Sequence, residues 1–526
     1  MNNYFNYVKR AMLIALFFPP ALWAQNKKPN VLIIMVDDVA QNALSIYSHG
    51  MQYPTPNIDR IGKSGIIFTD SYAQPSCTAG RAALITGQMP IRTGLTTVGQ
   101  PGNPIGLQKE DPTIADLLKP MGYMTGQIGK NHLGDRNEHL PTVHGFDEFY
   151  GILYHLNVLE EPEQADYPKT KDFKEKYGPR GVIESYATNK DDATMDARFG
   201  RIGKQTVKDL GPLTIEKMKS FDDSCVVRSK AFMKKAKDAD KPFLLWHNSS
   251  RMHVYTHLKD EHKNLATPIS EDLDKFGSGL IEHDMQVGEL LDYLKELGMD
   301  KNTIVIYTSD NGPEQSTWPD AGTTMFRGEK MTTWEGGVRV PLLVSWPGHI
   351  PADEYRNGIS SLEDILPTVM AAAGEPNINE KLKTGYKAGD MTYKVHIDGY
   401  NNLDYWTGKS KESARNAYYY WYESSLSGIR VGAWKLLFAT KPSGKYNEDM
   451  VKHTMPQLFN LRKDPFETYD DEIGFHQIMR KSWVLQPAIG YINNLMGTLK
   501  AFPPRQPAAS LDLNEAVERA LKATTN

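Results

Sequence analysis

Residues 31–36 read VLIIMV and run directly into Asp37 and Asp38. An apolar run of strand length without alternation is typical of a strand buried on both faces, as in a parallel sheet. A second run of this kind, TIVIY at residues 303–307, lies far along the chain. Together the two runs predict the centre of a parallel sheet.

Strand and helix patterns alternate outward from these runs. Helical spacing of apolar residues is found at 57–64, 113–118, 221–236 and 281–297, and further strands are predicted at 123–128, 243–246 and 342–345. This alternation predicts an α/β fold, with a large, mainly parallel sheet flanked by helices on both sides.

Two regions depart from the alternation. Residues 156–212 are polar, rich in charge, Pro and Gly, and weakly periodic, which predicts a variable insertion or lid within a main domain of residues 25–415. Residues 417–422 and 428–437 are aromatic and β-branched segments joined by a short turn. We therefore expect a smaller C-terminal α+β subdomain at 416–526, built on an antiparallel sheet with helices near its end.

Composition excludes several classes of protein. The 526 residues carry 60 Lys and Arg against 64 Asp and Glu, a net charge of −4. Nucleic acid is therefore not an expected partner, because binding it requires a basic field. Two cysteines cannot form a disulfide framework or a four-cysteine zinc site.

The N-terminus has the pattern of a secretory signal peptide over residues 1–24. Lys9 and Arg10 precede the apolar run AMLIALFF at 11–18, and Ala24 offers a small residue for cleavage. The run is shorter than the roughly 20 residues that span a bilayer, so no stable membrane anchor is expected. We expect an exported protein, periplasmic or secreted. The alternative is a buried helix of the main domain.

Acidic and amide side chains follow both central strands. Asp37 and Asp38 follow the first, and Asp310 and Asn311 follow the second. The carboxyl ends of parallel strands are where open α/β sheets bind ligands. Three carboxylates and an amide form an all-oxygen set that suits calcium or magnesium. The alternative for each pair is capping of a following helix.

Cys77 lies in SYAQPSCTAGRAALITG, residues 71–87, with Arg81 four positions later. If a helix begins at the cysteine, Arg81 lies one turn along it and holds an anionic or polar group beside the thiol. The alternative is a buried structural cysteine, which is the interpretation we favour for Cys225.

CTAGRAALITG at 77–87 resembles the signature of the type I sulfatase family, in the alkaline phosphatase superfamily. Further matches follow in the order of that family: PNVLIIMVDD (29–38), GKNHLG (129–134), RMH (251–253), SDNG (309–312), RGEKMTTWEGGVRVP (327–341), EDILPTVMAAAG (363–374) and LFNLRKDPFET (458–468). The resemblance spans Pro29 to about Glu467 and implies the fold and the chemistry of that family.

The resemblance implies that a formylglycine-generating or sulfatase-maturating enzyme oxidises Cys77 to formylglycine. Its hydrate is the expected nucleophile and a metal ligand. One Ca²⁺ per subunit, with Mg²⁺ as the alternative, is expected to bind Asp37, Asp38, Asp310 and Asn311.

Roles for the remaining site residues are also implied by the resemblance. Arg81 orients the hydrate, and Lys130 and Lys330 bind sulfate oxygens. His253 is the general acid for the leaving oxygen, and His132 takes the proton that allows sulfate to be expelled.

Neighbouring residues of the same types are the alternatives to these candidates. His253 is preferred to His247 and His257, and Lys330 to Arg327. The aromatic segment 418–422 is assigned to a strand of the small sheet, with a sugar or aryl platform as the alternative.

The chain departs from the family pattern at Ala40, Asn131 and His155. Ala40 stands where Gly is usual and Asn131 where Trp is common. His155, in GILYH, takes the place of a polar sulfate contact of some family members and is not among the predicted site residues.

The function expected from these residues is hydrolysis of a sulfate monoester, either an aryl sulfate or a sulfated carbohydrate. Two alternatives remain at this point. One is a phosphonate or phosphate monoester hydrolase that uses the same formylglycine site. The other is an unmodified, inactive carbohydrate-binding protein.

Overall fold

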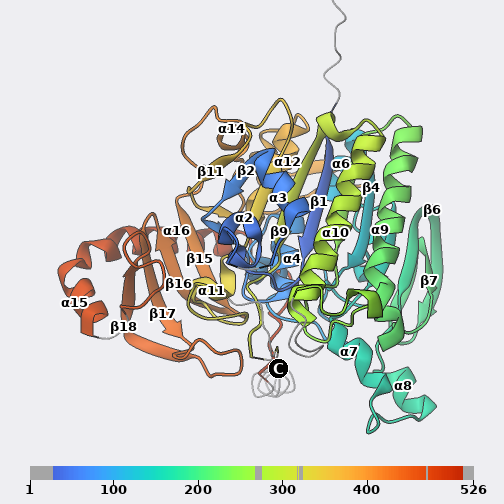
Figure 1. Ribbon diagram of the computed structural model, residues 1–526, viewed down its shortest axis with the longest axis horizontal. Helices are drawn as coiled ribbons and strands as arrows, with labels where there is room; N and C mark the ends of the chain where they lie inside the picture. Colours follow the sequence, from blue (N-terminus) through green and yellow to red (C-terminus); the bar gives the residue numbers. More distant parts are fainter. Residues whose placement is uncertain are drawn as a thin grey trace, which may run out of the picture.

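The computed structural model describes residues 28–51, 53–266, 275–316, 318, 324–469 and 472–512. The expected signal peptide, residues 1–24, lies outside them. Within these ranges, the chain forms one large sheet covered by helices and a smaller sheet beside it (Figure 1). No helix in the described part of the chain has the length and apolar character needed to span a bilayer.

The main sheet has ten strands among the described residues, in the order β11-β2-β10-β9-β1-β8-β4-β5-β6-β7. Its central strands all run parallel: β9 (Thr303–Ser309), β1 (Asn30–Val36), β8 (Phe243–Asn248), β4 (Met124–Lys130) and β5 (Glu148–Ile152). The mainly parallel sheet predicted from the sequence is confirmed. The predicted strand at 342–345 is β10 (Leu342–Ser345), and it runs antiparallel to β9 and to β2 (Gly65–Phe68). Beyond β2, β11 (Glu354–Arg356) forms the edge.

Strand β1 is buried along its whole length because helices cover both faces of the sheet. Its alternate residues enter separate cores: Leu32 packs into one and Ile33 into the other. The first core includes α3 (Pro56–Lys63), α9 (Ile215–Asp238) and α10 (Lys275–Glu296), and the second includes α4 (Cys77–Thr86), α6 (Ile114–Leu118) and α12 (Ile365–Ala372). Cys225 of α9 is fully buried in the first core, which confirms its assignment as a core residue.

The region 156–212 contains regular structure that its weak periodicity did not predict. It holds α7 (Leu156–Glu160), α8 (Lys171–Tyr177) and an antiparallel hairpin of β6 (Ile183–Asp196) and β7 (Gly200–Asp209). The hairpin extends the main sheet beyond β5 (Figure 1, right). Most side chains of β6 are exposed or half-buried, so the strand needs no apolar alternation.

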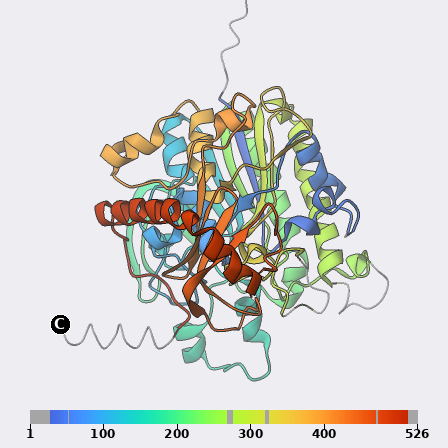
Figure 2. The ribbon, with the colours of Figure 1, turned by 90° about the vertical axis from the view of Figure 1, so that its left-hand side faces the viewer.

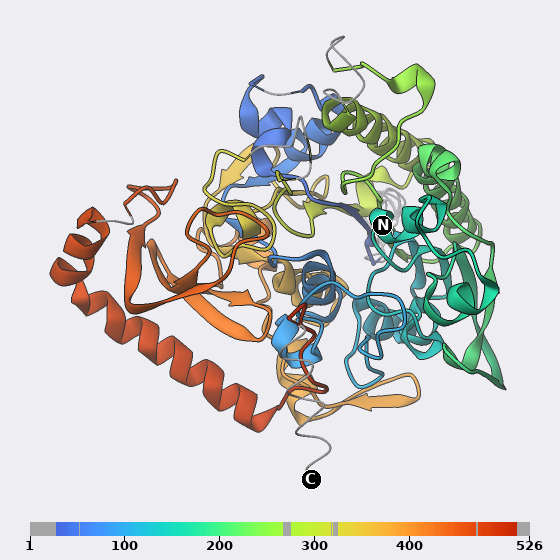
Figure 3. The same ribbon diagram turned by 90° about the horizontal axis from the view of Figure 1, so that it is seen from below.

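The C-terminal sheet is antiparallel, as predicted, with β15 (Ala417–Tyr422), β16 (Ser425–Val431), β17 (Trp434–Thr440) and β18 (Val451–Asn460). The segment 428–437 is not one strand: Gly432, with φ 57°, makes the turn between β16 and β17. Tyr418 and Tyr420 are buried, so the aromatic segment is a structural strand as favoured. The helices α15 (Glu472–Arg480) and α16 (Leu485–Ala501) are also found, and α16 lies along the outer face of this sheet (Figures 2 and 3).

The other short elements are α2 (Ser45–Ser48), β3 (Ser71–Tyr72), α5 (Pro90–Thr93), α11 (Glu335–Val338), β12 (Ser360–Ser361), α13 (Ile378–Thr384), β13 (Tyr386–Ala388), β14 (Met391–Tyr393) and α14 (Leu403–Trp406).

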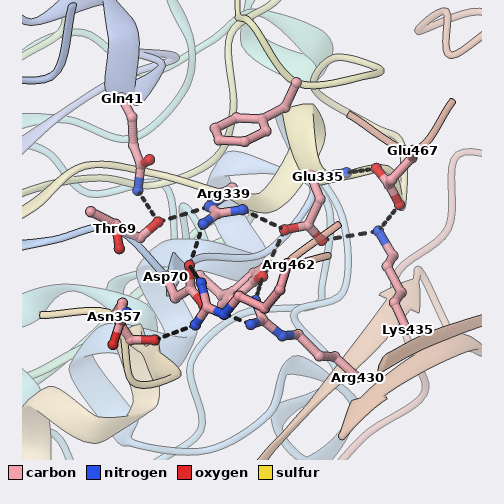
Figure 4. Close-up of polar contacts among 12 residues, drawn as sticks. Gln41, Thr69, Asp70, Glu335, Arg339, Asn357, Arg430, Lys435, Arg462 and Glu467 are labelled. Carbon is pink, nitrogen blue, oxygen red and sulfur yellow. Dashed lines mark hydrogen bonds and ion pairs between the residues drawn. The ribbon is translucent and has the colours of Figure 1, made fainter. Parts of the chain in front are cut away.

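Ion pairs with buried carboxylates join the C-terminal sheet to the main domain (Figure 4). Asp70 lies 2.6 Å from Arg430 and 2.7 Å from Arg462 and also contacts Arg339. Lys435 of β17 bridges two carboxylates, at 3.1 Å from Glu335 and 2.6 Å from Glu467. Because Glu335 begins α11, directly after the segment that carries Lys330, this junction fixes the small sheet next to the predicted site.

Candidate active site

The two acidic pairs lie side by side at the carboxyl ends of β1 and β9. These strands are neighbours in parallel register, with Val36 opposite Ser309. The backbone N–H of Asp38 donates to Oδ1 of Asp310 at 3.3 Å, and Nδ2 of Asn311 donates to Oδ1 of Asp38 at 2.6 Å. The strand ends therefore bring together the four residues that the sequence predicted as metal ligands. This side of the molecule is seen in Figure 3.

Helix α4 begins at Cys77 and brings that residue to the same point. The ligand atoms of Asp37, Cys77 and Asp310 all lie within 4.8 Å of one another. Gly80 allows this approach, because an added Cβ would collide with the backbone carbonyl of Asp310. Burial raises the pKa of Cys77 to about 11, so an unmodified thiol is protonated at neutral pH.

The donor set fits a hard divalent cation. Oδ1 of Asp37 and Oδ1 of Asn311 are buried and accept no hydrogen bond within the described ranges. Burial and the neighbouring charge of Asp37 raise the pKa of Asp310, and burial likewise raises the pKa of Asp38 well above its usual value. A cation bound by these oxygens would offset both the free-energy cost of burying the carboxylate charges and the repulsion between them.

Arg81 lies one turn along α4 and is fully buried among these ligands. Its Nε and one terminal nitrogen lie 2.9 and 2.8 Å from Oδ2 of Asp310. Its other terminal nitrogen donates to Oδ1 of Asn248 at 2.9 Å. Asn248 is not among the residues predicted from the sequence, although it ends β8 and the tendency of parallel strand ends to carry ligand-binding residues applies to it equally.

Both predicted lysines contact the acidic pairs. Lys130 ends β4 and contacts Asp37, whereas Nζ of Lys330 lies 2.8 Å from Oδ2 of Asp38. Burial opposes the ionisation of Asp37, but Lys130 and Arg81 outweigh it and hold the pKa of Asp37 well below its usual value. The guanidinium carbon of Arg327 lies instead 3.7 Å from the centre of the Trp334 ring. Of the two candidates, Lys330 is therefore the one that reaches the site.

The two predicted histidines also reach the site. Nδ1 of His132 lies 3.3 Å from Sγ of Cys77. Burial lowers the pKa of His132 and of His253 well below the usual value, with Lys130 acting further on the first and Lys330 on the second. Both imidazoles are therefore neutral in the protein alone. Asp38 and His132 have φ values of 59° and 58°, a left-handed conformation that costs energy in non-glycine residues.

The other histidines of the sequence analysis divide into two groups. His247 bonds to Ser229 at 2.8 Å and His257 to Glu160 at 2.7 Å, so both have structural partners elsewhere. The ring of His155, in contrast, stacks on His253 with centroids 5.4 Å apart and lies edge-on to His132 at 5.5 Å. His155 therefore lies in the same cluster of rings.

Glu314 is a second residue that the sequence analysis missed. A carboxylate oxygen of Glu314 and one ligand atom each of Asp38 and His253 all lie within 4.8 Å of one another. The carboxylate of Glu314 also lies 3.7 Å from Nζ of Lys330. A signal was present, since Glu314 follows Asn311 by three positions in the same loop.

Known proteins resemble this chain along most of its length. A family model described as Sulfatase matches residues 29–375. Human arylsulfatase A is 31% identical over 484 residues, which cover 88% of this chain and 86% of that protein. N-acetylgalactosamine-6-sulfatase of Canis lupus familiaris is 27% identical over 474 residues, which cover 84% and 81%.

Solved structures agree with these relatives. PsFucS1 sulfatase from Pseudoalteromonas sp. matches with a TM-score of 0.76 at 31% identity, over 92% of each chain. Ps i-CgsB in complex with k-i-k-neocarrahexaose matches with a TM-score of 0.70 at 26% identity, over 94% of this chain and 98% of that one. The chain belongs to the type I sulfatase family and is a sulfuric ester hydrolase.

Proposed function

We propose that this enzyme hydrolyses the sulfate monoester of a carbohydrate or aryl alcohol through a formylglycine formed from Cys77 and a bound Ca²⁺ ion. The observation that carries the proposal is the position of Cys77 at the start of α4. There its side chain lies beside the carboxylates of Asp37 and Asp310 and 3.3 Å from His132. A nucleophile, a cation site and a base thus share one buried point.

The chemistry begins with the modification of Cys77. We infer that a formylglycine-generating or sulfatase-maturating enzyme oxidises the side chain to an aldehyde, which adds water to give two hydroxyl groups on one carbon. Asp37, Asp38, Asp310 and Asn311 would hold a cation, which when bound would lower the pKa of a neighbouring hydroxyl and neutralise sulfate charge. Calcium suits this oxygen set, and Mg²⁺ is the alternative.

The side chains around residue 77 perform the remaining steps. One hydroxyl, having lost its proton, attacks sulfur, and the bond from sulfur to the leaving oxygen breaks. His253, which takes up a proton when the anionic sulfate binds beside it, supplies that proton to the leaving oxygen. His132 then takes the proton of the second hydroxyl, the carbon–oxygen bond to sulfate breaks, and the aldehyde re-forms. Lys130 and Lys330 bind the sulfate oxygens, and Arg81 orients the hydrate.

The relatives support a sulfated substrate and favour a carbohydrate. One is named for a sulfated amino sugar, and one structural neighbour was solved with a carrahexaose. Human arylsulfatase A is named for aryl sulfates.

Two measurements on the purified enzyme test the proposal. Mass spectrometry of the peptide that contains residue 77 should show a loss of about 18 Da relative to cysteine. p-Nitrophenyl sulfate and sulfated monosaccharides should be turned over faster than matched phosphate and phosphonate esters. An unmodified thiol in an active enzyme, or faster phosphonate turnover, would contradict it. Cys77→Ala should fold and have no activity.

We also propose that the enzyme is exported, to the periplasm or outside the cell, on the basis of the N-terminal pattern of Lys9, Arg10 and the apolar run 11–18. Expression of the full chain in a bacterial host, followed by fractionation and N-terminal sequencing, tests this. Recovery from the periplasm or the medium with a new N-terminus near Gln25 is expected, and an intact N-terminus in the cytoplasm contradicts it.

A further inference from the structure

A loop of the C-terminal sheet packs along the loop that carries Lys330. The first loop, residues 441–450, connects β17 to β18. Nε1 of Trp334 donates to the carbonyl of Lys441 at 2.7 Å, and Arg327 donates to the carbonyl of Pro442 at 2.6 Å. Gly444 lies so close to Gly328 that an added Cβ would be 2.9 Å from its Cα. The two loops, more than a hundred residues apart in sequence, therefore form one unit.

Glu329 ties this unit to the loop that follows the metal pair. Its carboxylate, on a residue with 1% exposure, accepts a hydrogen bond from the backbone N–H of Tyr446 at 2.9 Å. The same carboxylate accepts from the backbone N–H of Ser316 at 2.9 Å and also from that of Gln315. The position of Tyr446 is thus fixed by the residue that directly precedes Lys330.

The side chain of Tyr446 is half-buried, on a backbone that Glu329 holds next to the start of the Lys330 segment. Burial raises the pKa of Tyr446 to about 12, and the charges that act on it include Lys330, Glu314 and Cys77. Tyr446 comes from the C-terminal subdomain, whereas every predicted site residue comes from the main domain. It was absent from the sequence analysis because no motif includes it.

We infer that Tyr446 contacts the group from which sulfate is removed, the sugar or aryl ring of the substrate, and so contributes to specificity. This inference rests on the proposed function. Lys130, Lys330 and the acidic pairs supply the charges that a sulfate group requires. A neutral aromatic ring adds little for an anion, but it packs well on the apolar face of a sugar or an aryl ring. The nearby carboxylate of Glu314 accepts hydrogen bonds from hydroxyl groups of that ring.

The test compares a probe that has a ring with a probe that has none. In Tyr446→Ala, we expect KM for p-nitrophenyl sulfate to rise about fivefold to tenfold, the loss typical of one aromatic contact. The inhibition constant of inorganic sulfate should stay within about twofold of the wild type, because sulfate has no leaving group. Tyr446→Phe, which keeps the ring, should recover most of the KM. Lys445→Ala, an exposed neighbour in the same loop, is the matched control.

Three outcomes overturn the inference. One is an unchanged KM in Tyr446→Ala. The second is a parallel rise in KM and in the sulfate inhibition constant with a lower melting temperature, which indicates a structural role. The third is a formylglycine-containing wild type that turns over no sulfate ester, and this outcome alone removes the proposed function as well.

Discussion

Nδ1 of His132 lies 3.3 Å from Sγ of Cys77, although the two residues are 55 positions apart. The second ring nitrogen of His132 lies 3.2 Å from the carbonyl of Gly99, which fixes the orientation of the imidazole. Burial and the charge of Lys130 lower the pKa of His132, so the imidazole is neutral and able to accept a proton. This arrangement places a base next to the side chain that carries the proposed nucleophile.

His132→Ala should therefore lower kcat by about 10²- to 10⁴-fold, the range typical of general base catalysis. The first turnover should be affected least, because the base acts on the second half of the reaction. Rapid mixing with p-nitrophenyl sulfate should show a burst of about one nitrophenol per enzyme, followed by a slow phase. His349→Ala, at an exposed histidine, serves as the control. A kcat for His132→Ala within twofold of the wild type would refute the assignment.

Removal of the metal should lower thermal stability as well as activity. A cation present at about 100 times its Kd stabilises the folded state by about 3 kcal/mol. We expect EDTA to lower the melting temperature and Ca²⁺ to restore it more effectively than Mg²⁺. Asn311→Ala should make the melting temperature less sensitive to EDTA, whereas Asp292→Asn, at an exposed carboxylate, should respond like the wild type. Identical melting curves with and without EDTA, and no metal by elemental analysis, would count against the site.

Gly80→Ala should disrupt the site from within α4. The added Cβ collides with the carbonyl of Asp310, so the helix carrying Cys77 and Arg81 must move away from β9. Overpacking of this kind typically costs about 1–3 kcal/mol. We expect a lower melting temperature and at least a tenfold loss of kcat/KM. Gly490→Ala, at a position of α16 where a Cβ meets open space, is the matched control. Full activity in Gly80→Ala would contradict the close packing.

The junction between the two sheets should respond to pH through Glu467. Burial raises the pKa of Glu467 from its usual 4.5 to about 7. The positive charge of Lys435 acts in the opposite direction, but Lys435 is paired with Glu335 as well as with Glu467. Between these values the folded protein binds more protons than the unfolded chain, so the free energy of unfolding falls as pH rises from 4.5 to about 7.

Glu467→Gln removes this proton uptake and should become more stable relative to the wild type as pH rises over the same window. Over this window, the free energy of unfolding of the variant should rise relative to that of the wild type by at most about 3 kcal/mol. Melting temperatures of the two proteins at about pH 5 and about pH 7.5 provide the measurement. Glu296→Gln, at an exposed position of α10, should show no such trend. A constant difference between Glu467→Gln and the wild type at both pH values would show that Glu467 does not titrate in this range.

The sequence by itself determined the centre of the sheet and the residues at its carboxyl edge. An unbroken apolar run such as 31–36 is stable only when buried on both faces, and the end of such a strand is where polar side chains must turn out of the core. The Cys77 motif and its companions identified the family for the same reason: each lies in a short local segment whose chemistry can be recognised without the rest of the chain.

Only the tertiary structure decided the direction of β10, the hairpin of β6 and β7, and the parts of the site that come from distant loops. β10 runs antiparallel to β9. Its four residues are buried and apolar or small, and such a pattern does not specify the direction of a strand. Asn248 and Glu314 reach the site through contacts between segments far apart in the chain, and a hydrogen bond to Glu329 holds the backbone of Tyr446 next to the segment that carries Lys330. Such contacts depend on how distant segments pack against one another, which has no periodic pattern in the sequence. The charged residues of the site could therefore be predicted, whereas the neighbouring loop of Tyr446, on which we propose that substrate choice depends, is brought there only by the folded chain.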